Sequence, residues 1–128
     1  MFADLKAGWE FLPADSTGAG DDRETVDRYL HRNNGCSFAA FDDGKMVGAL
    51  LAGHDGRRAL LNHLFVRPEY RRRGIARQLA ALSFGELRNQ GVHRAAVFIH
   101  KTNDIARRFW ETVGGKKVDF IETYGIDF

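Results

Sequence analysis

The chain is poor in the residues that small proteins use for covalent or metal cross-links. It has one cysteine, Cys36, and two prolines among 128 residues. A single thiol cannot form an internal disulfide, and a catalytic thiol needs a neighbouring base. Cys36 follows Asn33-Asn34-Gly35 at the start of an expected strand, so we interpret it as a packing residue. The histidines show no metal-ligand spacing with one another or with Cys36, and we assign no metal.

Long apolar runs are also absent. No run approaches the roughly 20 residues that a helix needs to cross a bilayer, so we expect no membrane partner. The segment from Met1 to Lys6 shows no basic region followed by an apolar stretch and a cleavage site. With no secretory signal visible, we expect a cytoplasmic location. The motifs Gly-x-x-x-x-Gly-Lys-Ser/Thr and Gly-x-Gly-x-x-Gly do not occur, which argues against nucleotide hydrolases and dinucleotide-binding enzymes.

The composition that remains is that of a globular protein. Apolar residues make up 44% of the chain and charged residues 28%. The length predicts one domain over residues 1–128, without room for a second. The net charge of +2 conceals a cluster of arginines at positions 67, 71, 72, 73 and 77. Such clusters can bind nucleic acid, but Tyr70 is the only aromatic residue among them, so this partner is the weakest hypothesis.

The spacing of apolar residues predicts an order of elements. Phe2, Leu5, Trp9 and Leu12 recur at helical spacing and stop at Pro13, which indicates a first helix. Asp21 and Glu24 resemble a capping box that opens a second helix. We expect strands over 37–41, 45–52, 59–66, 95–100 and 117–124, and further helices over 74–90 and 104–113. The predicted order is therefore α-α-β-β-β-α-β-α-β.

The stretch from Val66 to Ala76 has the pattern of a phosphate-binding turn. A strand passes through Arg71-Arg72-Arg73 and Gly74 into a helix. Such a turn presents unpaired backbone N–H groups, the positive end of the helix dipole and cationic side chains to one anion. Gly74 has no Cβ, so a phosphate group can approach the backbone there. The pattern predicts a phosphorylated cofactor.

Two motifs resemble the signatures of the GNAT acetyltransferase superfamily. Arg71, Gly74 and Ala76 fit Gln/Arg-x-x-Gly-x-Gly/Ala. The segment from Asn103 to Gly115 is similar to the second signature, Asn-x-x-Ala-x-x-Phe-Tyr-Glu-x-x-Gly-Phe, at the expected distance downstream. Together with the strand patterns, the resemblance covers nearly the whole chain from Met1 to Phe120.

The resemblance implies an α/β (α+β) architecture, the GNAT fold. Its central sheet is mixed but mostly antiparallel and is flanked by about four helices. The first strand of that fold is missing from the predicted order. We expect the resulting unprotected sheet edge to favour a homodimer.

The resemblance also implies that acetyl-CoA is the cosubstrate. In the family, pantetheine lies in a gap between the strands that correspond to 59–66 and 95–100, and the pyrophosphate lies on the arginine-glycine turn. The expected cofactor-binding residues are Leu64, Phe65, Val66, Arg71, Arg72, Arg73, Gly74, Ile75, Ala76, Asn103, Phe109 and Trp110. An arginine surplus at this turn also suits the 3′-phosphate of coenzyme A.

The chemistry implied is direct attack of an amine on the thioester, without an acyl-enzyme. His63 is a candidate general base because imidazole titrates in the useful range, and Asn62 is a candidate for orienting a water. Strand alternation predicts that only one of the two faces the acceptor cleft. Trp110 stands where many family members have a tyrosine that protonates the leaving thiolate; an indole cannot do so, and Tyr124 is a possible substitute.

These expectations define the predicted function and its alternative. We expect an acetyl-CoA-dependent N-acetyltransferase that acts on a primary amine of a small molecule, an amino acid or a protein N-terminus. The alternative is a catalytically weak or inactive GNAT-like module that binds acetyl-CoA or CoA. Acidic runs that would mark a polyamine or basic-peptide acceptor are absent.

Overall fold

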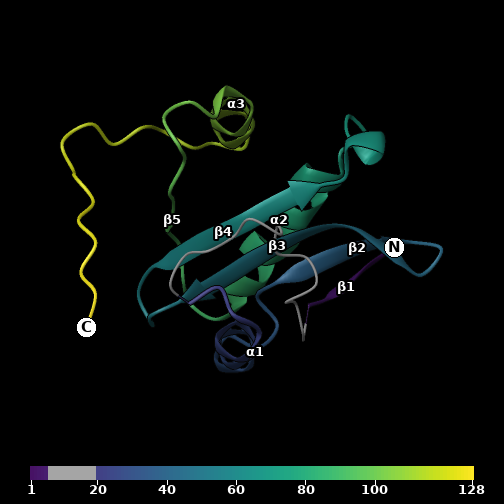
Figure 1. Cartoon of the computed structure of the whole chain (residues 1–128), viewed down its shortest axis with the longest axis horizontal. Helices are drawn as coiled ribbons and strands as arrows, with labels where there is room; N and C mark the ends of the chain where they lie inside the picture. Colours follow the sequence, from purple (N-terminus) through teal and green to yellow (C-terminus); the bar gives the residue numbers. More distant parts are fainter. Residues whose placement is uncertain (6–19) are drawn as a thin grey trace. The chain divides into compact units, whose positions relative to one another are not determined.

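The computed structural model describes residues 1–5 and 20–128 (Figure 1). The chain divides into two compact units, residues 1–98 and 99–128, which are described separately. The predicted first helix, over residues 2–12, is wrong at its start, where Phe2–Asp4 is a strand, and its residues 6–12 lie outside the described residues. The first unit contains β1 (Phe2–Asp4), α1 (Arg23–Arg32), β2 (Phe38–Asp42), β3 (Lys45–His54), β4 (Ala59–Val66), α2 (Ile75–Asn89) and β5 (Ala95–Val97). The second unit contains α3 (Asp104–Thr112).

The five strands form one mixed sheet in the order β1-β2-β3-β4-β5. The pairs β1–β2, β2–β3 and β3–β4 are antiparallel, while β4 and β5 are parallel. A parallel pair needs a crossover, which α2 provides between β4 and β5. The predicted mixed, mostly antiparallel α/β sheet is confirmed.

The prediction that the first strand is missing is wrong. Phe2–Asp4 pairs antiparallel with β2, with Phe2 opposite Ala40 and Asp4 opposite Phe38. Three residues are too few for an alternating pattern, and this strand is defined by partners far along the chain. Because β1 covers this edge of β2, the edge is not unprotected, and the expected homodimer no longer follows from it.

The end of the chain also departs from the prediction. The described residues 116–128 contain no helix or strand, so the strand expected over 117–124 does not form there. β5 ends at Val97 rather than at residue 100. The described residues contain three α-helices, and the first of the four predicted helices falls mostly on residues outside them.

Helix α1 begins one residue later than predicted. Asp22, not Asp21, is its N-cap, because the Asp22 carboxylate accepts hydrogen bonds from the backbone N–H (3.1 Å) and the hydroxyl (2.7 Å) of Thr25. The apolar side chains Val26 and Leu30 bury the helix against one face of the sheet. Their core cluster also contains Leu5, Ala39, Ala49 and Leu51, with Tyr29, Phe41, Met46 and Phe65 packed around it.

Helix α2 packs against β2, β3 and β4 from the other face (Figure 1). Its buried positions are Leu79, Ala80, Ser83 and Leu87. The Ser83 hydroxyl donates to the carbonyl oxygen of Cys36 at 2.8 Å. Cys36 is fully buried, and burial raises the pKa of its thiol, which supports the packing role.

The helices found in the described parts of the chain are too short or too polar to cross a membrane.

Candidate active site

A β-bulge interrupts β4 at its centre. Asn62 lies opposite Leu51 and Phe65 opposite Ala49, so His63 and Leu64 together oppose the single residue Leu50. His63 adopts a left-handed backbone conformation with φ of 50°. Few residues other than glycine adopt this conformation, and such residues are frequent at functional sites.

The bulge brings Asn62 and His63 to the same side of the sheet. Asn62 shares a face with its partner Leu51, which lies in the core cluster under α1. The His63 Nε2 atom lies 3.2 Å from the Oδ1 atom of Asp21, beside the start of α1. The predicted alternation, with Asn62 and His63 on opposite faces of the strand, is therefore wrong, because the extra residue interrupts it.

A hollow of about 460 Å³ lies on this face, where α1 ends and β4 begins. Its lining residues are Tyr29, Arg32, Asn33, Gly53, His54, Asp55, Arg58, Ala59 and Leu60. His54 and Asp55, at the end of β3, line this hollow, and Arg57 is not among the lining residues. Gly53 pairs with Leu60, two residues before Asn62 on β4.

Tyr29 lies between the hollow and Asn62. A Cβ atom on Gly53 would lie 2.5 Å from the Tyr29 hydroxyl, so the phenol packs directly on β3. Burial raises the pKa of Tyr29 to about 12, and the nearby Asn62 side chain partly offsets this effect. Its helical spacing with Val26 places Tyr29 on the apolar face of α1. The small residue Gly53 opposite it was the available signal, but local sequence does not show which glycine faces α1.

The pairing of β4 with β5 ends at Leu61 and Val97. Beyond this point Arg67 donates its backbone N–H to Val47 on β3, so the backbone groups of the preceding residue, Val66, point away from β3. The Val66 carbonyl oxygen accepts a hydrogen bond from Arg71 Nε at 3.0 Å. In the described residues, no strand pairs with this side of β4 from Asn62 onward.

Phe65 differs from its neighbours on β4. It pairs with Ala49 and its side chain packs against the core cluster under α1. This position gives Phe65 a packing role, although it was predicted to bind the cofactor together with Leu64 and Val66.

The arginine-glycine turn leads directly into α2. Arg72 and Gly74 have φ of 63° and 79°, so the chain passes twice through the left-handed region before the helix begins. The N–H of Gln78, bonded to the Gly74 carbonyl at 3.1 Å, is the first that bonds within the helix. The N–H groups of residues 75–77, in the first turn of α2, therefore have no partner within the helix and form an anion-binding arrangement at its N-terminus. A Cβ on Gly74 would meet nothing within 4 Å, so open space lies beside this backbone.

The three arginines of the turn are exposed. Within the described part of the chain, none of them forms an ion pair with a carboxylate. Arg73 lies over the ring of Tyr70, 5.0 Å from its centre. The Tyr70 hydroxyl donates to Asp42, and this hydrogen bond raises the pKa of Tyr70. The turn is thus positively charged.

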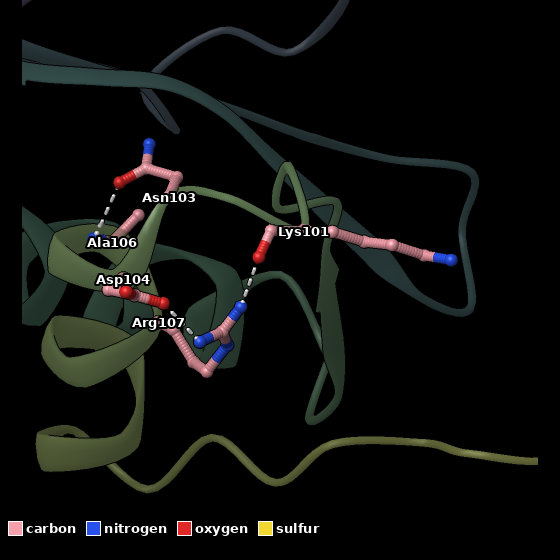
Figure 2. Close-up of polar contacts among 5 residues, drawn as sticks. All are labelled: Lys101, Asn103, Asp104, Ala106 and Arg107. Atoms are coloured by element: carbon pink, nitrogen blue, oxygen red, sulfur yellow. Dashed lines mark hydrogen bonds and ion pairs between the residues drawn. The ribbon is translucent and has the colours of Figure 1, made fainter.

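In the second unit, Asn103 caps α3. Its Oδ1 atom accepts a hydrogen bond from the N–H of Ala106 at 3.0 Å, while its amide nitrogen points away from the helix (Figure 2). Arg107 joins Asp104 to the Lys101 carbonyl on the same turn (Figure 2). The Asn103 oxygen therefore has a capping role, and its NH₂ group is the part left to meet a ligand.

The end of α3 explains Gly114 of the second motif and also Gly115, which stands where that motif has Phe. Gly115 and Gly114 donate to the carbonyl oxygens of Trp110 (2.8 Å) and Glu111 (3.2 Å), and Gly114 has φ of 102°. This is a Schellman motif. A Cβ on Gly115 would lie 2.7 Å from the Trp110 carbonyl oxygen, so a side chain is excluded there.

The aromatic pair of the motif packs edge to face. The rings of Phe109 and Trp110 are 5.0 Å apart at an angle of 73°, and Trp110 is buried. Tyr124, the candidate substitute acid, is 80% exposed, and its hydroxyl lies 3.4 Å from the Glu122 carboxylate.

Comparison with known proteins gives a consistent result. Residues 6–114 match the family model described as the acetyltransferase (GNAT) family. An acetyltransferase of Pectobacterium atrosepticum is 28% identical over 101 residues, which are 79% of this chain and 72% of that protein.

Two solved structures have similar folds. The aminoglycoside N-acetyltransferase AAC(6')-Iy, in complex with CoA, aligns with a TM-score of 0.69 at 25% identity, over 85% of this chain and 79% of that one. The PaiA N-acetyltransferase of Thermoplasma acidophilum, in complex with coenzyme A, aligns with a TM-score of 0.74. It is 16% identical over 94% of this chain and 92% of its own, which is a likeness of fold alone.

Proposed function

Because this chain belongs to the GNAT acetyltransferase family, we propose that it transfers an acetyl group from acetyl-CoA directly to a primary amine of a small molecule, an amino acid or a protein N-terminus. Membership of this family makes it an acyltransferase, and the CoA complexes of its structural neighbours support acetyl-CoA as cosubstrate. The observation that carries the proposal is the turn at Gly74, where exposed arginines and the free N–H groups of α2 meet open space.

The proposed cofactor site follows β4 into this turn. The main chain of Leu64 and Val66 would bind the pantetheine arm, since this side of β4 has no partner strand in the described residues. The N–H groups of Ile75 and Ala76 would bind the pyrophosphate together with Arg71–Arg73. Asn103, Phe109 and Trp110 remain proposed cofactor residues through the family motif that they match.

The acceptor would approach from the α1 side of β4, where Asn62 and His63 both lie. An alkylamine with a pKa of about 10.4 is almost wholly protonated at neutral pH, so a proton must be removed before attack. His63 is the proposed base and Asn62 a proposed ligand for the amine or for a water. The hollow beside Tyr29 continues this face and would receive the rest of the acceptor.

Trp110 occupies the position at which many family members have a tyrosine. Its indole N–H cannot protonate a thiolate. A thiol of pKa about 8.5 gives a thiolate that leaves without an acid, and the proton released by the amine then neutralises it. We therefore propose that the reaction does not need a tyrosine here.

The test is amine-dependent release of CoA thiol from acetyl-CoA, with a panel of small amines, amino acids and peptides. We expect turnover with at least one amine, and a loss of roughly 10²- to 10⁴-fold in kcat for His63→Gln, the range of general-base catalysis. His93→Gln, at an exposed position outside the site, is the matched control. An unchanged rate in both His63→Gln and Asn62→Ala would remove their catalytic assignment.

Trp110 also favours one alternative, a module that binds CoA without turnover. That hypothesis predicts that CoA raises the melting temperature while no amine yields an acetylated product. Mass spectrometry of the amine panel after long incubation distinguishes it from a slow enzyme.

A further inference from the structure

Asp21 and His63 form a close pair between residues 42 positions apart in the chain. The Asp21 Oδ1 and His63 Nε2 atoms are 3.2 Å apart. Both side chains are mostly buried, with 22% of Asp21 and 28% of His63 exposed. Interactions between partly buried groups are screened less by solvent and salt than those on the surface.

Two features of the backbone produce this pair. Asp22 takes the N-cap position of α1, which leaves the preceding residue, Asp21, outside the helix. The bulge in β4 turns His63 toward α1. The backbone of His63 is left-handed there, a conformation that costs free energy for any residue other than glycine. Neither a regular strand nor a helix capped at Asp21 would bring these two side chains together.

The pair fixes the roles of the imidazole nitrogens. A carboxylate oxygen accepts hydrogen bonds but does not donate them, so the hydrogen atom of the contact belongs to Nε2 of His63. The neutral ring then carries its lone pair on Nδ1. A base whose tautomer is fixed in advance needs no reorganisation before it accepts a proton.

We propose that Asp21 is a positioning residue that holds His63 in the Nε2–H tautomer and presents Nδ1 as the base. This inference rests on the proposed function. Nδ1 accepts a proton from the substrate ammonium, and the freed amine nitrogen forms a bond to the thioester carbonyl carbon. The C–S bond breaks, the thiolate of CoA leaves, and the second proton lost by the nitrogen neutralises it.

The experiment combines nitrogen NMR of His63 with steady-state kinetics. In the wild-type protein, ¹⁵N shifts of the neutral His63 ring show Nε2 protonated and Nδ1 unprotonated. Asp21→Ala shifts the ring toward a mixture of tautomers. Asp21→Asn lowers kcat roughly 10- to 100-fold, a smaller loss than removal of the base itself, and leaves KM for acetyl-CoA within about twofold.

Asp22→Asn is the matched control. It removes a neighbouring carboxylate but keeps a good N-cap residue, so kcat stays at the wild-type value. A His63 ring protonated on Nδ1 in the wild-type protein overturns the inference, and this readout does not depend on the stability of any variant. Wild-type kcat in Asp21→Asn with a large loss in His63→Gln also overturns it, yet leaves the proposed function intact. Full activity in His63→Gln removes the base itself and the role of Asp21 with it.

Discussion

The Nε–H group of Arg71 donates to the carbonyl oxygen of Val66 at 3.0 Å, so the arginine is anchored to the strand that leads into the turn. Its terminal NH₂ groups are left to face a ligand. This hydrogen bond fixes the position of the Arg71 side chain in the phosphate-binding turn relative to the end of β4. A cofactor that lies along β4 meets a guanidinium already held in position.

Arg71→Ala should therefore weaken CoA binding. A hydrogen bond to a charged group contributes about 1.5–3 kcal/mol, so we expect the Kd measured by calorimetry to rise roughly 10- to 100-fold. The Kd of Arg71→Lys should fall between those of the wild-type protein and Arg71→Ala, because lysine keeps the charge but lacks the planar guanidinium. Arg88→Ala, in the last turn of α2, is the control that removes an exposed arginine away from the turn. Equal Kd values for all four proteins would contradict the assignment.

Gly74→Ala should separate cofactor binding from stability. The left-handed φ of 79° costs an alanine about 1–2 kcal/mol, and its Cβ would project into the open space beside the free N–H groups. Gly44→Ala is the matched control, with φ of 77° and open space around its Cβ but a place in the β2–β3 hairpin. We expect similar losses of unfolding free energy in both variants, and at least tenfold weaker CoA binding in Gly74→Ala alone. Wild-type affinity in Gly74→Ala would mean that the backbone there does not contact the cofactor.

Tyr29 should make the fold sensitive to alkaline pH. Its pKa is raised to about 12 by burial, above the ordinary value of 10.0, so the unfolded chain ionises first. The stabilisation is complete below pH 10 and is lost as pH rises through about 12. Denaturant unfolding of the wild-type protein and Tyr29→Phe across this interval should show a smaller decline in the variant. Parallel declines would show that Tyr29 ionises as easily in the folded state as in the unfolded chain.

Gly53→Ala and Gly85→Ala should change stability in opposite directions. A Cβ at Gly53 would lie 2.5 Å from the Tyr29 hydroxyl and 2.7 Å from the Asn33 side chain, so overpacking should cost about 1–3 kcal/mol. A Cβ at Gly85, within α2, would meet no atom within 4 Å, so alanine there should raise the free energy of unfolding by about 0.5–1 kcal/mol. Chemical denaturation measures both. A neutral Gly53→Ala would mean that Tyr29 does not pack on β3 as described.

The sequence predicts those elements whose signals are local. The limits of β4, residues 59–66, were predicted as observed, because a run of apolar residues is bounded by Arg58 and by Arg67-Pro68. The start of α2 at Gly74 and the end of α3 at Gly114 were also predictable, because a glycine is visible in the sequence at each boundary. Both glycines adopt the left-handed φ that these boundaries require.

Features that depend on distant partners were not visible. β1 exists through its pairing with β2, and the bulge at His63 and Leu64 exists only in register with Leu50. Asp21 and Asp22 are adjacent aspartates, and the sequence does not distinguish which of them caps α1. Asp22 is the cap because its carboxylate accepts hydrogen bonds from Thr25. The contact between Asp21 and His63 follows from both of these choices, so no pattern along the chain predicted it.

The central claim is that the turn around Gly74 binds the phosphates of CoA, and thermal unfolding with added ligand tests it most directly. We expect acetyl-CoA and CoA each to raise the melting temperature, and ATP to leave it unchanged. A ligand at 100 times its Kd adds about 2.7 kcal/mol to the free energy of unfolding. No shift with either CoA species in a well-folded sample, or an equal shift with ATP, would contradict the claim.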